Sequence, residues 1–249
     1  MKARWEDRKT LNELKFPFLR ACNSLEKRIE LVLKINDTNW VDDQEDDYFY
    51  LSTLYQFGVF FGWIRVLEGK AHLEFSNNKE TKVFYRLFFN IMESFTGHVH
   101  FSKLPDVPFE EKCKGTFQRL VIRAMGELMV SINPRDNSAQ GYRMLEFTEF
   151  VTLMNESDKF KKWFGYLGNF LRNLEKSPKD LRWDRLLIIA SFLSIMSKYL
   201  DPRNLQSSSQ ITTYFDVVQN PEVVESLKIS YQKLGMEKQL KNAKKFLLV

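Results

Sequence analysis

Apolar residues recur at helical spacing along most of this 249-residue chain. Between residues 11 and 32 they lie three, four and seven positions apart, which predicts one face of a helix. Pro17 suggests that the regular part of this helix begins near that residue, because proline suits a first helical turn. The same spacing predicts helices at 84–95, 160–174 and 117–132 and a shorter one at 141–154. In 117–132 the predicted apolar face consists of Phe117, Leu120, Val121, Ala124, Met125, Leu128, Met129 and Ile132.

Two segments, 48–68 and 186–196, are apolar on nearly all sides. In the first, seventeen uncharged residues span about 26 Å as a helix, just short of a hydrocarbon core of about 30 Å. Its first half carries hydroxyl and amide side chains, so we expect a central helix of a water-soluble protein and no transmembrane segment. Gly58 and Gly62 would let a neighbouring helix approach closely.

These patterns predict an all-α, single-domain bundle of roughly six or seven helices, with two central apolar helices and a C-terminal extension. Residues 204–210 resemble a linker, which predicts a bundle domain at 1–202 and a linker with a basic helical tail at 203–249. Within that tail, residues 211–218 are expected to form a short strand or a docked extended piece. A helix is expected to begin at Pro221.

Several stretches resemble an uncharacterised, mostly bacterial family of all-helical proteins. They are YFYLSTLYQFGVFFGWIRVLE, QRLVIRAMGELMV followed by GYRMLEF, and FKKWFGYLGNFLRNL, in that order. The similarity covers about residues 17–201 and is carried by an aromatic S-T-L-Y helix and an R-A-x-G-E helix. It implies one domain of long helices and names no substrate.

Composition narrows the class of protein further. The chain has 37 Lys and Arg against 32 Asp and Glu, interleaved along its length, so a net charge of +5 only slightly favours anionic partners. Cys22 and Cys113 lie far apart and form neither a disulfide framework nor a zinc motif. The first residues mix both charge signs without an apolar run, so no targeting signal is predicted and a cytoplasmic location is expected.

Patterns typical of catalytic or metal chemistry are scarce. Five carboxylates lie between Asp42 and Asp47, but no glycine stands where a calcium loop needs its turn, so we interpret them as favouring the start of the next helix. His98 and His100 form an H-x-H motif without a nearby acidic or cysteine ligand, which favours an ordinary loop over a metal site. Nucleophile, phosphate-loop and dinucleotide motifs are absent from the sequence. No cofactor, metal or enzymatic activity is therefore predicted.

The most distinctive polar set is on the 117–132 helix. Arg119, Arg123 and Glu127 are spaced by four and lie on one side, roughly opposite the apolar face. Arg65 and Glu68 could join them if the two helices are adjacent. This set is either a contact for an anion or a partner protein or a solvent-exposed ladder of small energetic effect.

Two functional hypotheses stay open. The first is a non-enzymatic interaction or scaffold protein that docks a protein partner through its aromatic helices and C-terminal tail. The second is a basic accessory factor that binds nucleic acid or an anionic membrane surface. Its candidate contacts are Lys233, Lys238, Lys241, Lys244 and Lys245. A homo-oligomer is compatible with either hypothesis.

Overall fold

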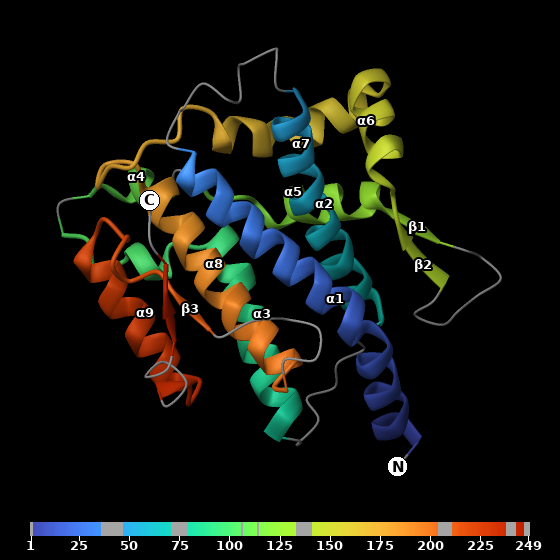
Figure 1. The fold of residues 1–249 in the computed structure, drawn as a ribbon, viewed down its shortest axis with the longest axis horizontal. Coiled ribbons are helices and arrows are strands. Elements are labelled where there is room, and N and C mark those ends of the chain that lie inside the picture. The colour runs from blue at the N-terminus through green and yellow to red at the C-terminus, as the bar shows by residue number, and fades with distance from the viewer. Residues whose placement is uncertain are drawn as a thin grey trace. The chain divides into compact units, whose positions relative to one another are not determined.

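The computed structural model describes residues 2–35, 47–70, 79–105, 107–113, 115–132, 141–203, 211–237 and 243–246. The structure is 74% helical, so the predicted all-α bundle is confirmed. Figure 1 shows the α-helices of the described residues. They are α1 (Lys2–Lys34), α2 (Asp47–Lys70), α3 (Lys79–Thr96), α4 (Phe109–Cys113), α5 (Arg119–Met129), α6 (Phe147–Glu156), α7 (Asp158–Leu171), α8 (Leu181–Leu200) and α9 (Pro221–Lys233).

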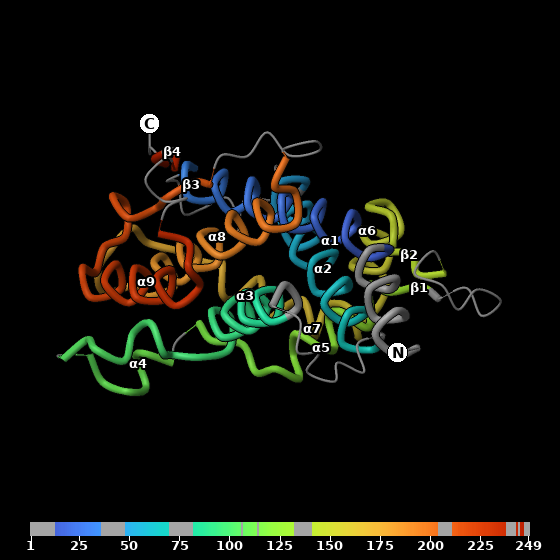
Figure 2. Tube along the Cα trace, turned by 90° about the horizontal axis from the view of Figure 1, so that it is seen from below, coloured from blue at the N-terminus to red at the C-terminus, as the bar shows by residue number. Residues whose placement is uncertain are grey.

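Strands are short in the described part of the chain. β1 (Val130–Ile132) pairs antiparallel with β2 (Tyr142–Met144), and Val130 is opposite Met144. β3 (Thr212–Thr213) pairs in parallel with β4 (Lys244–Lys245), and Figure 2 shows the two segments next to each other. A 3₁₀ turn, η3 (Val99–Phe101), follows α3.

The contacts between residues divide the chain into two compact units, each built from segments that are distant in sequence. Unit 1 comprises Met1–Leu25, Asn39–Asn77 and Gln118–Arg172. Unit 2 comprises Glu26–Thr38, Asn78–Phe117 and Asn173–Val249. The boundary expected at residue 202 stays a prediction.

α2 is the central helix of unit 1, and its ring-bearing face is buried. Phe57, Phe60 and Phe61 are fully buried. The hydroxyls of Ser52 and Thr53 both donate to the carbonyl oxygen of Phe49, at 3.1 and 2.7 Å, so this helix buries polar side chains with their hydrogen bonds satisfied. Among the residues described, none of the helices combines the length and the apolar character needed to cross a bilayer.

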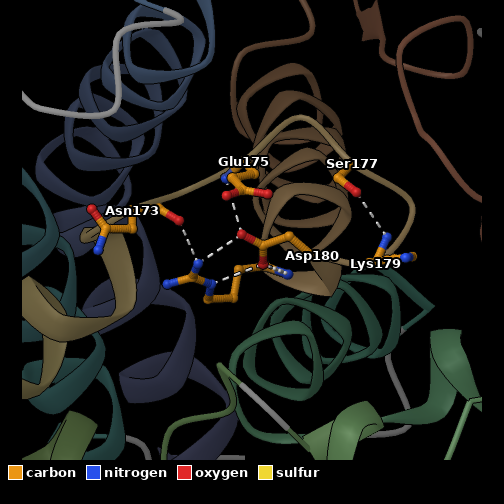
Figure 3. Close-up of polar contacts among 6 residues, drawn as sticks. Asn173, Glu175, Ser177, Lys179 and Asp180 are labelled. Atoms are coloured by element: carbon orange, nitrogen blue, oxygen red, sulfur yellow. Dashed lines mark hydrogen bonds and ion pairs between the residues drawn. The ribbon is translucent and has the colours of Figure 1, made fainter.

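α8 is the central helix of unit 2, as predicted. Every side chain from Trp183 to Ser197 is buried, and α3 packs along it (Figure 1). A helix that is apolar on all sides requires such enclosure. Asp180 precedes the helix and caps it: its carboxylate accepts from the backbone N–H of Arg182 at 3.1 Å and from the Arg182 guanidinium (Figure 3).

Several predicted helix boundaries are wrong, among them the end of the predicted 160–174 helix, which stops at Leu171. α1 runs through Pro17, although proline cannot donate to the carbonyl of Glu13, because buried Leu14 and Phe18 on either side hold the helix in place. The predicted 117–132 helix ends at Met129, where β1 begins.

The predicted 141–154 helix begins with strand β2 instead, and its helical part starts only at Phe147. The side chains of Glu146 and Glu149 form a reciprocal capping box at this point, which fixes the start of α6.

The C-terminal region is part of unit 2. Thr212 and Thr213 form a short strand, which is one of the two predicted alternatives, and α9 begins at Pro221 as predicted. Val223, Leu227 and Tyr231 of α9 are fully buried. The described part of this region is therefore packed into the core of unit 2, and Lys244 and Lys245 near its end form a strand and not a helix.

Candidate functional site

The outward side of α5 carries the predicted polar set. Val121, Ile122, Met125, Gly126 and Met129 are buried against the rest of unit 1. On the opposite side Arg119, Arg123 and Glu127 are exposed, one helical turn apart. This alternation follows directly from the amphipathic pattern of the segment.

A close helix crossing brings Arg65 to this surface. At Gly126 an added methyl group would lie only 2.5 Å from the backbone carbonyl oxygen of Phe61, so only glycine permits the observed approach of α2 to α5. At Gly62 a methyl group would lie 3.2 Å from Cβ of Met129 and would also meet the sulfur of Met144. Gly62 thus lies at the close approach of α2 and α5, as predicted, whereas a methyl group at Gly58 would meet only side-chain atoms of Met129 and Phe164, at 3.0 Å.

Glu127 holds two guanidinium groups together. Its Oε1 accepts from Nε of Arg65 at 2.9 Å and from Nε of Arg123 at 3.3 Å. The pKa of Glu127 is lowered below its ordinary value, most strongly by the hydrogen bond from Arg65 and further by the charge of Arg65 and by Arg123. Two cations share one anion, so the cluster keeps a net positive charge at neutral pH. Because half of the Glu127 side chain is exposed, the pairs stabilise the fold only weakly.

The remaining predicted members lie beside this cluster. Arg119 is exposed one turn before Arg123 and forms no ion pair with any described residue. Glu68 is half-buried on α2, one turn after Arg65, and no ion pair joins it to the described arginines.

The predicted apolar face of α5 is wrong at Leu120. The sequence pattern predicts it as a core residue, but its side chain is 70% exposed between the two exposed arginines. Helical geometry explains the error, because Leu120 lies at the edge of the stripe, one position before Val121, where no described element covers it. We call Arg65, Arg119, Leu120, Arg123 and Glu127 the α5 patch.

The C-terminal lysines are described only in part. Lys233 is exposed at the end of α9, and Lys245 is exposed with its Nζ 2.8 Å from Oδ2 of Asp216. Lys238 and Lys241 lie outside the described residues, and for Lys244 only the backbone is described. No basic cluster can therefore be assembled from the described lysines.

The H-x-H motif does not place its two rings together in a strand. His100 lies in η3, is buried, and has Nδ1 3.1 Å from Oγ of Ser226. His98 packs edge-on against the ring of Phe109. Burial, and then the charge of Arg185, lower the pKa of His100 to about 4, so it is neutral at physiological pH.

No group of histidine, cysteine and carboxylate side chains suited to a metal ion occurs among the residues described. The acidic residues 42–46 lie outside the described residues.

Sequence reasoning missed two buried polar clusters in unit 2. In the first, Asp184 of α8 accepts from the backbone N–H groups of Gln219 and Asn220, at 2.7 and 3.0 Å, and from the Asn220 amide at 2.8 Å. Arg185, the next residue, donates to the carbonyl oxygens of Ser94, Gly97 and Lys112. Burial raises the pKa of Asp184 and lowers that of Arg185 to about 10, yet both side chains are bonded and serve to fix α8 to its neighbours.

The second cluster joins Glu26 and Glu30 of α1 to Tyr214. A charged residue within an otherwise apolar stretch, such as Asp184 in α8, is a signal that could have found the first cluster. The second has no local signal, because Tyr214 is separated from the two glutamates by more than 180 residues.

No family model, curated protein or solved structure matches this chain. The resemblance to an uncharacterised helical family stays a prediction, and the candidate site rests on its geometry.

Proposed function

We propose that this chain is a non-enzymatic interaction or scaffold protein that docks a protein partner on the α5 patch. The partner segment would present a large apolar side chain flanked by carboxylates. The apolar side chain would cover Leu120, and the carboxylates would pair with Arg119 and Arg123.

The exposure of Leu120 is the observation that carries the proposal. Complete burial of a leucine side chain stabilises a complex by about 1.5–3 kcal/mol relative to leaving it in water. Leu120 is exposed on a helix whose other apolar positions mostly face the interior. A partner that covered it would gain this free energy without rearrangement of α5.

The arginines supply charge complementarity. Arginine is enriched in protein interfaces because its planar group pairs with carboxylates through two parallel hydrogen bonds. Arg123 is already held by Glu127, so part of its side chain is ordered before a partner arrives. The exposed Arg119 is one turn away and offers a second cation to an acidic segment.

The proposed interface differs from the expectation drawn from the sequence in two respects, because it uses neither the aromatic rings nor the C-terminal tail. The rings of Phe57, Phe60 and Phe61 in α2 are fully buried, so they support the site from within and are not its contact surface. α2 instead contributes Arg65 at the rim of the patch.

Photo-crosslinking in the native cell tests the proposal. A benzophenone amino acid at the exposed position Gln118, beside the patch, should trap a defined partner, and the same group at exposed Lys161 of α7 should not. Leu120→Ala should weaken binding of the purified partner about tenfold, which corresponds to about 1.4 kcal/mol. Leu31→Ala, at another exposed leucine, is the matched control and should leave the affinity unchanged.

Charge is tested separately. Arg119→Ala combined with Arg123→Ala should weaken binding, and the exposed pair Lys159→Ala and Lys161→Ala should not. Unchanged affinity in both the leucine and the arginine variants would refute docking on the α5 patch. Tight binding of mixed-sequence DNA that weakens log-linearly with salt would instead favour the nucleic-acid hypothesis.

A further inference from the structure

Unit 2 brings two carboxyl groups and one hydroxyl to a single point. The hydroxyl of Tyr214 lies 3.1 Å from Oε1 of Glu26 and 2.9 Å from Oε1 of Glu30. Both glutamates belong to α1 and are one helical turn apart, so their side chains point the same way. Tyr214 comes from the segment that follows β3.

The number of protons decides how this cluster is held together. A tyrosine hydroxyl has one hydrogen and donates to one oxygen at a time. Two ionised carboxylates could not both accept from this hydroxyl at once, and they would repel each other in a buried place. If one carboxyl carries a proton, every oxygen in the cluster can have a hydrogen-bond partner.

Glu26 is the group that holds this proton. It is buried, 7% exposed, whereas Glu30 is half-buried. The pKa of Glu26 is raised from 4.5 to about 7, mainly by burial and further by the charge of Glu30. A hydrogen bond from Ser194 acts in the lowering direction. The Tyr214 hydrogen bond and the charge of Lys27 act in the lowering direction.

The two tyrosines that face Glu26 remain neutral at this pH. Burial raises the pKa of Tyr214 well above 10, so the hydroxyl remains a donor. Burial, and to a smaller extent the charge of Glu26, raises the pKa of Tyr231 on α9. The charge state of the cluster near neutral pH is therefore set by its carboxyl groups.

The same tyrosine anchors the C-terminal segment. Its ring packs on that of Phe246 with centroids 5.1 Å apart, and the backbone N–H of Phe246 donates to the carbonyl oxygen of Thr213 at 2.9 Å. The backbone N–H of Thr212 donates to Oγ of Ser194 at 2.8 Å, and Ser194 also bonds to Glu26. Loss of the Tyr214 contact would therefore loosen β3, β4 and Phe246 together.

We propose that Glu26, Glu30 and Tyr214 form a proton-dependent latch that holds the C-terminal segment on α1. The latch is closed while the two carboxyl groups share one proton, and it weakens when that proton is lost. Opening would free β4 and Phe246, together with the exposed Lys245, from Tyr214 and β3.

The direction of the pH effect follows from proton binding. The closed latch binds a proton up to about pH 7, whereas in the open state Glu26 is in water and loses it near its ordinary value. The open state is therefore favoured increasingly as the pH rises to about 7, and the effect then levels off. Between pH 6 and pH 8 these two values correspond to an increase of about tenfold in the opening equilibrium.

Hydrogen exchange at single amides measures the opening. The amides of Thr212 and Phe246 report the latch, and those of α8 report unfolding of the core. Each rate is divided by the intrinsic rate of the unstructured chain at the same pH. In the wild-type protein the protection of Thr212 and Phe246 should fall about tenfold between pH 6 and pH 8. Protection of the α8 amides should change by only about two- to threefold, because unfolding of the core also exposes His100, whose contribution has the opposite sign.

Two variants and one control separate the latch from general destabilisation. Glu26→Gln keeps the shape and cannot ionise, so protection should become independent of pH. Tyr214→Phe keeps the ring on Phe246 but lacks the hydroxyl, so protection should already be reduced at pH 6. Glu225→Gln removes an exposed carboxylate on α9 and should behave as wild type.

Three results would overturn the latch: wild-type protection that does not change with pH, a Glu26→Gln variant that keeps the tenfold change, or a Tyr214→Phe variant with full protection at pH 6. If Glu26→Gln does not fold, the Tyr214→Phe result decides the question.

Discussion

The contribution of His100 to the stability of this protein is predicted to fall in mild acid. The ring is 3% exposed, lies 5.5 Å from that of Phe192, and has Nδ1 3.1 Å from Oγ of Ser226. Burial and the nearby Arg185 charge lower its pKa from 6.5 to about 4 in the folded state. The unfolded chain therefore binds more protons between pH 6.5 and pH 4, so stability is complete above 6.5 and is lost as the pH falls.

The size of the effect follows from the two pKa values. A shift from 6.5 to about 4 corresponds to ~3 kcal/mol of unfolding free energy across the whole range, and ~2 kcal/mol of it is lost by pH 5. Glu26 acts in the opposite direction over nearly the same range, because its folded pKa is raised and stability falls as the pH rises from 4.5 to 7. The two contributions largely cancel in the wild-type protein.

Urea unfolding of the variant His100→Asn at pH 7.5, 6.5, 5.5 and 5.0 separates them. The asparagine amide can stay near Ser226, but the variant lacks the ring and the titrating group. It should be less stable than wild type at pH 7.5, and this difference should shrink by ~2 kcal/mol at pH 5. Ser226→Ala, which keeps the histidine, should cost about 1 kcal/mol and keep the wild-type pH dependence. A stability difference between His100→Asn and wild type that is the same at all four pH values would refute the reasoning.

Three further changes test the packing described above. Gly126→Ala should push α2 and α5 apart at Phe61 and lower the unfolding free energy by about 1–3 kcal/mol in urea unfolding, whereas Gly165→Ala, where a methyl group meets nothing within 4 Å, should be neutral or stabilising. Asp184→Ala should leave three N–H donors unbonded and cost about 3–5 kcal/mol by thermal unfolding; a cost under about 1 kcal/mol would contradict the assigned role. Truncation after Arg203 should remove core residues of unit 2 and broaden or abolish its cooperative unfolding by circular dichroism, and an unchanged transition would show that this region is dispensable.

Local periodicity was a reliable guide to most helices. The apolar spacing in α3 and α7 and the largely apolar character of α2 and α8 predicted helices with buried apolar faces. A helical repeat of 3.6 residues places residues at this spacing on one side of the helix. The polar set on α5 was predicted from the same rule. The contact between Arg65 and this set was predicted on the condition that α2 and α5 are neighbours.

The failures share a different cause. The segment 141–146 has residues suited to a helix, but Tyr142 and Met144 pair with β1 through hydrogen bonds that helical propensity does not describe. Leu120 fits the apolar pattern and is nevertheless exposed, because burial depends on whether another element covers that side of the helix. The local sequence gives no sign that Glu26 is buried, because its partner Tyr214 comes from a distant part of the chain.

The sequence by itself thus determined the helical class, the two central helices and the outward polar face of α5, because each depends on interactions within a few residues. Only the tertiary structure decided the exposure of Leu120, the pairing of Arg65 with Glu127, and the buried clusters at Asp184 and Tyr214. Each of these depends on which distant segments meet, and the energies of buried polar groups are settled only by the partners that they find there.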